Sequence, residues 1–346
     1  MNQARSQKIV MDGYGSYLGM EKGCFVLRDR KGNEEKYPLF ENEISEVVLR
    51  SGNMVSTGAL ASLGFWDVDV MVMTQKGKPV AMLRSLDDDS HVKTRICQYD
   101  ALSNGKGIEV AKRIVYGKIE GQNQVLKKYG LLQHELTKVK VALSGVKSEE
   151  LNKVRRKLIS LEGKFTEKYF EQVFRLLPEE LRPERRKKFK AYDGINNIFN
   201  LAYTMLKWRV HRAILGAKLE PYLGFIHSEQ HGKPSLVCDF MELYRYIVDD
   251  FVIEFCQGLK PKDFVMKDER TTRKRWSKRE YLNGSKTREL ERGLDELFED
   301  MVDVPRIKHG QRQTLGTLIN EEALLLAKYL RGERDFWIPR VVISKP

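Results

Sequence analysis

Residues 151–176, LNKVRRKLISLEGKFTEKYFEQVFRL, have the most regular pattern in this chain. When successive residues are placed 100° apart, as on an α-helix, the apolar side chains fall on one stripe. The stripe consists of Leu151, Val154, Leu158, Leu161, Phe165, Tyr169, Val173 and Leu176. It predicts one amphipathic helix that packs against a core. The same periodicity runs from about residue 91 to about residue 335, so we expect a mostly helical domain there.

A carboxylate, Glu162, falls within this apolar stripe. A charge that faces a core is costly unless it is paired, protonated or bound to a metal ion. This helix alone leaves two interpretations open: an ion pair with a buried Arg or Lys of another helix, and a metal ligand. Gly163 follows it at a cost of about 1 kcal/mol in helix propensity, which a close approach of another backbone would explain.

The first 86 residues have a different pattern, made of short β-branched runs separated by turn signals. The runs lie at residues 8–11, 24–27, 44–49 and 68–73, and a short helical piece lies near residues 56–63. Strands this short and evenly spaced favour a small β-sandwich. We therefore expect an α+β chain with a small N-terminal β-sandwich domain (1–86), a linker (87–92) and a larger, mostly α-helical catalytic domain (93–346).

Composition and charge narrow the class of partners. The 346 residues include 61 Lys and Arg against 48 Asp and Glu, a formal net charge of +13. Such an excess attracts polyanions such as DNA, although a merely basic protein would have the same charge. Asp67 and Asp69 interrupt the best apolar segment, and no run reaches the ~18 apolar residues of a membrane span. The four cysteines form no CxxC pair, so we expect a reduced, cytoplasmic location and no membrane.

Two basic clusters stand out in the second region. Residues 182–190 contain six basic side chains and one acidic, and residues 270–279 contain six basic side chains, none acidic, and a tryptophan. One such cluster alone is typical of a solvated loop or helix face. Two in one domain favour a surface that contacts phosphates. The candidate contacts are Arg185, Arg186, Lys187, Arg273, Lys274, Arg275 and Trp276.

Further residues with catalytic potential follow Asp193, which is a candidate helix N-cap. Gly224-Phe-Ile-His227 ends at a turn, and Asp239 and Glu242 are i,i+3 neighbours on one helix face. Taken singly, the histidine is typical of a hydrogen-bonded core residue and the acidic pair of a solvated face. Together with Glu162 they form a His/carboxylate set that suits Mg²⁺ or Mn²⁺. Such an ion beside a basic DNA track would support phosphodiester chemistry.

Four blocks of this sequence resemble, in order and spacing, the CRISPR-associated integrase family of spacer acquisition (Cas one). They are LEGKFTEKYF (161–170), DGINNIFNLAY (193–203), EPYLGFIH (220–227) and PSLVCDFMELYR (234–245). The N-terminal β region and residues 319–332 also fit, so the resemblance covers nearly the whole chain. It implies a β-sandwich that forms a dimer interface and a helical domain with one Mn²⁺ or Mg²⁺ site.

The resemblance also implies roles for individual residues. Glu162, His227 and Glu242 would be the metal ligands, and Asp239 a nearby catalytic residue that binds the ion through water or orients a ligand. Tyr203 and Arg245 would contact DNA.

The function that the resemblance implies is a metal-dependent DNA integrase and endonuclease. A homodimer would join a smaller partner protein (Cas two) and insert DNA fragments into the CRISPR array, the fragment's 3′-hydroxyl attacking a repeat-end phosphodiester. One alternative is a structure-selective nuclease that hydrolyses branched DNA. Another is a non-catalytic, basic DNA-binding scaffold whose carboxylates form ion pairs. The position of Glu162 in its apolar stripe favours the enzymes over the scaffold.

Overall fold

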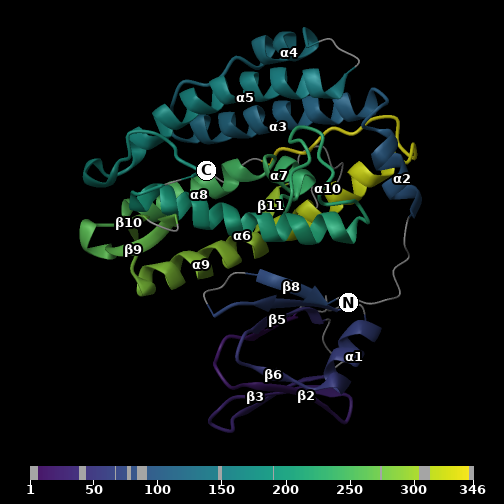
Figure 1. Ribbon diagram of the computed structural model, residues 1–346, viewed down its shortest axis with the longest axis vertical. Coiled ribbons are helices and arrows are strands. Elements are labelled where there is room, and N and C mark those ends of the chain that lie inside the picture. The colour runs from purple at the N-terminus through teal and green to yellow at the C-terminus, as the bar shows by residue number, and fades with distance from the viewer. Residues whose placement is uncertain are drawn as a thin grey trace. The chain divides into compact units, whose positions relative to one another are not determined.

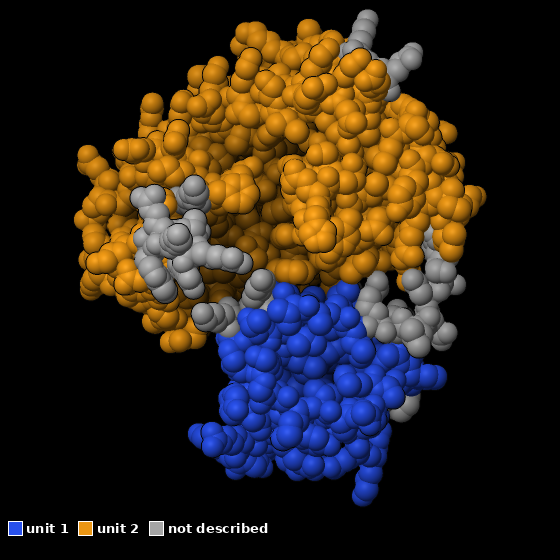
Figure 2. All heavy atoms as spheres, in the orientation of Figure 1, with its two compact units in different colours: residues 1–90 blue, residues 91–346 orange. Residues whose placement is uncertain are grey.

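The computed structural model describes residues 7–38, 44–66, 68–75, 79–83, 92–146, 150–189, 191–272, 275–303 and 312–342. The chain divides into two compact units, residues 1–90 and residues 91–346 (Figure 2). The expected linker, residues 87–92, lies outside the described residues except for its last residue. In the part of the chain that is described, no helix is long and apolar enough to cross a membrane.

The first unit contains two four-stranded sheets. One has the order β1(Gln7–Met11), β5(Ile44–Arg50), β7(Asp69–Met73), β8(Pro79–Leu83), and the other β4(Glu34–Pro38), β3(Cys24–Arg28), β2(Tyr17–Glu21), β6(Met54–Val55). Side chains of both sheets share one core, with Ile9 and Val47 from the first and Leu18 and Phe25 from the second. The expected small β-sandwich is therefore confirmed.

A short helix, α1(Thr57–Phe65), lies where the sequence indicated one. It begins after Ser56, whose side chain accepts a hydrogen bond from the backbone N–H of Ala59, and it adds Ala59 and Leu63 to the same core. The first sheet ends at β8, an edge strand on which Val80 and Leu83 are exposed.

The second unit is mostly helical, as expected. Its helices are α2(Val92–Asp100), α3(Lys106–Lys128), α4(Leu136–Ser144), α5(Leu151–Val173), α6(Gly194–Gly216), α7(Ser235–Met241), α8(Arg245–Gln257), α9(Gly284–Glu299) and α10(Leu315–Leu330). The helix expected over residues 151–176 is α5, which ends at Val173 and is followed by a 3₁₀ turn over Phe174–Leu176.

Two antiparallel strand pairs interrupt the helices, which the sequence did not predict. One is β9(Phe264–Thr272) with β10(Arg275–Leu282), and the other is the short pair β11(Met301–Asp303) with β12(Arg312–Thr314). The polar and charged sequence of β9 and β10 lacks the alternation that identifies a half-buried strand. The described residues of the second basic cluster, 270–272 and 275–279, belong to these two strands.

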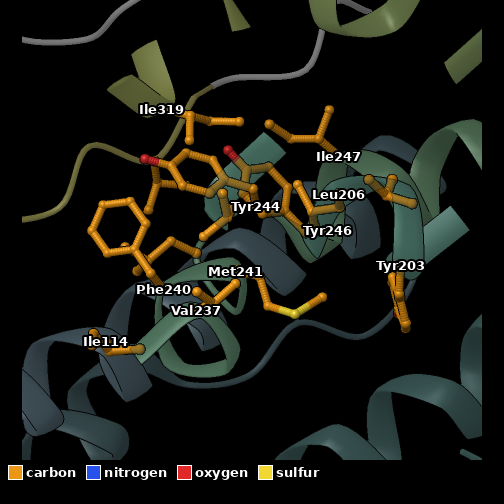
Figure 3. Packing of buried hydrophobic residues seen from close by; sticks show 14 of the residues in the cluster. Ile114, Tyr203, Leu206, Val237, Phe240, Met241, Tyr244, Tyr246, Ile247 and Ile319 are labelled. Carbon is orange, nitrogen blue, oxygen red and sulfur yellow. The ribbon is translucent and has the colours of Figure 1, made fainter. Parts of the chain in front are cut away.

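Helix α3 is central to the second unit and packs on both α5 and α8 (Figure 1). A glycine allows this close packing: a Cβ at Gly121 would lie 2.3 Å from the Cδ1 atom of Tyr246. Figure 3 shows aromatic and aliphatic side chains that fill the core here, among them Phe240 of α7, Tyr246 of α8 and Tyr244 between the two helices. The packing brings residues of α3, α5 and the α7–α8 junction to one point.

Candidate active site

Three charged side chains from three elements meet in the second unit. Lys118 of α3 forms ion pairs with Glu162 of α5 and with Glu242, which caps the C-terminus of α7. The Lys118 Nζ atom lies 2.7 Å from Oε2 of Glu242. The side chains of Lys118 and Glu242 are 4% and 7% exposed, whereas that of Glu162 is 21% exposed, so Glu162 lies at the edge of this cluster.

The ion pairs keep all three groups charged despite their burial. Burial favours the neutral form of Glu242, but Arg245 and Lys118 outweigh it and hold the pKa of this carboxyl well below its ordinary value. Burial also opposes ionisation of Glu162, and Lys118 again outweighs it, so this pKa is lowered as well. Burial lowers the pKa of Lys118, yet the two carboxylates together raise it above its ordinary value.

Each carboxylate has a second anchor. Arg245, at the start of α8, lies 3.1 Å from Oε1 of Glu242. The hydroxyl of Thr166, one turn along α5, donates to Oε1 of Glu162 at 2.8 Å. These anchors fix the two carboxylates independently of Lys118.

The loop that carries His227 is held from both sides. Oδ2 of Asp239 accepts the backbone N–H groups of Phe225 and Ile226 at 2.6 and 2.8 Å, and Oδ1 accepts that of His227 at 3.0 Å. From the other side, the buried Arg155 of α5 donates to the carbonyl oxygens of Gly224 and Phe225. The loop is therefore fastened to both α5 and α7.

Asp239 also sets the orientation of the His227 ring. Its Oδ1 atom lies 2.6 Å from Nδ1 of His227. A carboxylate that accepts at this distance assigns the proton to Nδ1 and leaves the Nε2 lone pair free. Because Asp239 is fully buried and both of its oxygens are engaged, its geometry suits the orienting role.

Glu162 and Glu242 offer oxygen donors that suit a divalent metal ion. Glu162 and Glu242 already converge on one cation, the Lys118 ammonium, and Oε2 of the buried Glu242 has no aligned hydrogen bond. Carboxylate oxygens are the donors that Mg²⁺ and Mn²⁺ prefer. His227 does not join them: among the described residues, no three His, Cys, Asp or Glu side chains form a group that could hold a metal. The carboxylate pair therefore suits such an ion, whereas His227, expected as a further ligand, stands apart from the pair.

A groove with a volume of about 990 Å³ lies between α5 and the segment that follows it, and Gly163, Arg185 and Lys187 are among the residues that line it. A cavity of about 30 Å³ adjoins it and is lined by Lys118 and Glu242. The residues that line both are Thr166, Phe170, Arg186 and Lys188.

The expectation that another backbone approaches Gly163 closely was wrong, because a Cβ at this position would meet open space.

Two expected DNA contacts, Arg186 and Tyr203, are committed to internal interactions. Arg186 donates to Asn196 and Asn200, and its guanidinium lies 5.3 Å from the centre of the Tyr203 ring. Tyr203 is 7% exposed and donates its hydroxyl to Asp249. Tyr203 therefore lies inside the second unit, whereas Arg186 also lines the groove, and direct contact of either residue with DNA stays a prediction.

Arg245 links Tyr203 to the site, with its guanidinium 4.5 Å from the centre of the Tyr203 ring. Burial raises the pKa of Asp249 to about 6, although hydrogen bonds from Tyr203 and Tyr169 favour its ionised form.

The second basic cluster is described in part. Arg273 and Lys274 lie outside the described residues, and for Arg275 and Trp276 the backbone alone is described, within β10. Their contact with DNA stays a prediction.

Sequence reasoning missed Lys118, Arg155 and Asp249. Lys118 lies on the buried face of α3 beside Ile114 and Ile119, so the signal that singled out Glu162, a charge within an apolar stripe, would have identified it too.

Comparison with known proteins agrees with this fold. The family model described as CRISPR associated protein Cas1 matches residues 9–285. CRISPR-associated endonuclease Cas1 2 of Pyrobaculum aerophilum is 31% identical over 75% of this chain and 86% of its own length. CRISPR-associated endonuclease Cas1 of Korarchaeum cryptofilum is 28% identical over 74% of this chain and 80% of its own length.

Solved structures share the fold at lower identity. A Cas1 protein from Thermotoga maritima has a TM-score of 0.71 at 16% identity, over 98% of this chain and all of that one. A casposase bound to its integration product has a TM-score of 0.74 at 20% identity, over 95% of this chain and 92% of that one. The family model and the Pyrobaculum relative, which match most of this chain, show that it belongs to the Cas1 family of CRISPR-associated endonucleases.

Proposed function

We propose that this protein is a metal-dependent DNA integrase and endonuclease of CRISPR adaptation. It would insert DNA fragments into the CRISPR array by transesterification at a site built from Glu162, His227 and Glu242. The observation that carries the proposal is the convergence of two ionised carboxylates, the buried Glu242 and the partly buried Glu162, beside a groove with basic lining. Solved relatives in fold include a casposase bound to an integration product and a Cas1–Cas2 complex, in line with DNA and a Cas two protein as partners here.

The residues have separate tasks in this reaction. Glu162 and Glu242 would hold Mg²⁺ or Mn²⁺, and Asp239 would orient His227 as the third ligand. The bound ion supplies charge neutralisation at the phosphoryl oxygens. A new bond forms between the fragment's 3′-oxygen and phosphorus while the bond to the leaving 3′-oxygen breaks, and the proton of the attacking hydroxyl passes through solvent to that leaving oxygen. Arg185 and Lys187 would hold the DNA backbone in the groove.

A strand-joining assay tests the proposal. The purified chain is incubated with Mn²⁺, a supercoiled array plasmid and a short duplex with 3′-hydroxyl ends, and joined products are resolved on a gel. We expect joining by the wild type, none by Glu242→Gln, and none when the duplex carries 3′-dideoxy ends. Plasmid cleavage that persists with dideoxy ends, without any joining by the normal duplex, would favour the hydrolytic nuclease. Binding of DNA without joining or cleavage would favour the non-catalytic scaffold.

Salt dependence of DNA binding tests the groove. Each phosphate contact contributes about 0.9 to the slope of log K against log salt on duplex DNA. Replacing Arg185 and Lys187 together by alanine should therefore flatten the slope by about two units for every sequence alike. The matched control is Lys138→Ala with Lys153→Ala, two exposed lysines of α4 and α5 that pair with Glu135 and Glu150 and do not line the groove. An unchanged slope in the groove variant would mean that DNA binds elsewhere.

We also propose that the β-sandwich unit mediates dimerisation. The apolar edge strand β8 exposes Val80 and Leu83, at 59% and 40%, and an unpaired edge of this kind is a template for pairing with a second chain.

A further inference from the structure

A buried ammonium group lies at the point where two of the proposed metal ligands meet. Lys118 pairs there with Glu162 and Glu242, which arrive from different helices. Among the described residues, these two carboxylates are its ion-pair partners. Lys118 is therefore the cation that contacts both carboxylates, whereas Arg245 contacts Glu242 alone. A divalent ion would match the two carboxylates in charge.

The two carboxylates are arranged so that another cation can replace the Lys118 ammonium. Lys118 contacts Oε2 of Glu242, the oxygen without an aligned hydrogen bond, while Arg245 holds the opposite oxygen, Oε1. On the other side, Thr166 holds Glu162 through its own hydrogen bond. Loss of the ammonium would therefore leave both carboxylates anchored.

The surroundings also offer a place for the displaced amine. Lys118 lines the small cavity of about 30 Å³, which shares Thr166 and Lys188 with the large groove. A lysine has a flexible four-carbon stem and a compact charge, so its amine can move while its backbone stays fixed. An arginine, with its rigid planar group, would make such a movement more difficult.

We propose that Lys118 is an internal counter-cation that holds Glu162 and Glu242 together in the metal-free protein and is exchanged for the divalent ion when metal binds. The two cations compete, because both need the same oxygens and repel each other at this range. The proposal rests on the proposed function, since it requires that these carboxylates bind metal. It also explains why Glu162 and Glu242 lie together while His227 stands apart. This is the arrangement that Lys118 stabilises in the metal-free protein.

The test is Mn²⁺ binding by the full chain, measured by titration calorimetry and by the Mn²⁺-induced change in melting temperature. In Lys118→Met, the metal-free protein should melt earlier and bind Mn²⁺ about tenfold more tightly, or better, because a competing charge is gone. Lys118→Arg keeps the charge and should bind no more tightly than the wild type. The matched control is Lys128→Met on the same helix, which loses ion pairs to Asp250 and Glu254 and should keep wild-type Mn²⁺ affinity.

A second measurement uses the wild type, so it does not depend on the folding of a variant. Lysines are acetylated with and without Mn²⁺, and peptides containing Lys118 and Lys128 are quantified by mass spectrometry. We expect labelling of Lys118 to rise with Mn²⁺ while that of Lys128 stays constant. Unchanged labelling of Lys118, or equal or weaker Mn²⁺ binding by Lys118→Met, would overturn the exchange while leaving the metal site intact. No Mn²⁺ binding by the wild type would overturn the metal site and the exchange with it.

Discussion

Asp239→Asn is the change that tests most directly how the His227 loop is held. The carboxylate accepts three backbone N–H groups and contacts the imidazole Nδ1 atom, with both oxygens in use. Asparagine offers one acceptor oxygen, and its amide nitrogen must then face N–H donors. If the oxygen remains opposite Phe225 and Ile226, the contacts to His227 are lost.

The expected loss of stability follows from these contacts. A hydrogen bond to a charged group contributes about 1.5–3 kcal/mol, and a buried donor without a partner costs about 1–3 kcal/mol. At least one charged bond is lost and at least one donor is left unpaired, so unfolding free energy should fall by about 3 kcal/mol or more. Because His227 loses its orienting partner, Mn²⁺ affinity should also fall by about 10- to 100-fold.

Urea unfolding followed by circular dichroism measures the first effect, and calorimetric Mn²⁺ titration of the folded variant measures the second. The control is Asp268→Asn, the same chemical change at an exposed position on β9 in the same unit. It should alter neither quantity. A loss of less than about 1 kcal/mol in Asp239→Asn would refute the argument, since that is the size of a single ordinary hydrogen bond.

Three further predictions follow from other contacts. Arg155→Met removes two donors to buried carbonyls and should cost about 3 kcal/mol in urea unfolding, whereas its exposed neighbour Arg156→Met should cost almost nothing. Asp249 has a pKa raised to about 6, so between pH about 4 and about 6 the folded state binds more protons than the unfolded state. Unfolding free energy should fall across this window as pH rises, and Asp249→Asn should remove that fall relative to the wild type. Val80→Lys places a charge on the exposed edge β8 and should shift the sedimentation profile from dimer to monomer; an unchanged dimer would place the interface elsewhere.

Local sequence determined the longest predicted helix, several strands of the first unit and the candidate residues taken singly, but not the β9–β10 and β11–β12 pairs. The apolar stripe of residues 151–176 requires a helix because its side chains share one face, and α5 has these bounds except for the closing 3₁₀ turn. Asp193 begins α6 because its carboxylate accepts the N–H of Asn196, an interaction between residues three apart. Glu162 was noticed for the same reason: a charge within an apolar stripe is visible from spacing alone.

The tertiary structure decided which charges meet. Lys118 and Glu162 are 44 residues apart, and Arg155 reaches the carbonyl of a residue 70 positions later, so no local pattern relates them. The sequence left two interpretations of Glu162 open, an ion pair and a metal ligand. The packing of α3 on α5 supplies its ion-pair partner, Lys118. Arg186 was expected at the surface because it lies in a basic run, and Tyr203 was expected to contact DNA from the family resemblance. In the structure, Asp249 binds Tyr203 and the asparagines of α6 bind Arg186. Periodicity gives the face of a helix, but the element that covers this face is set by the packing of distant segments.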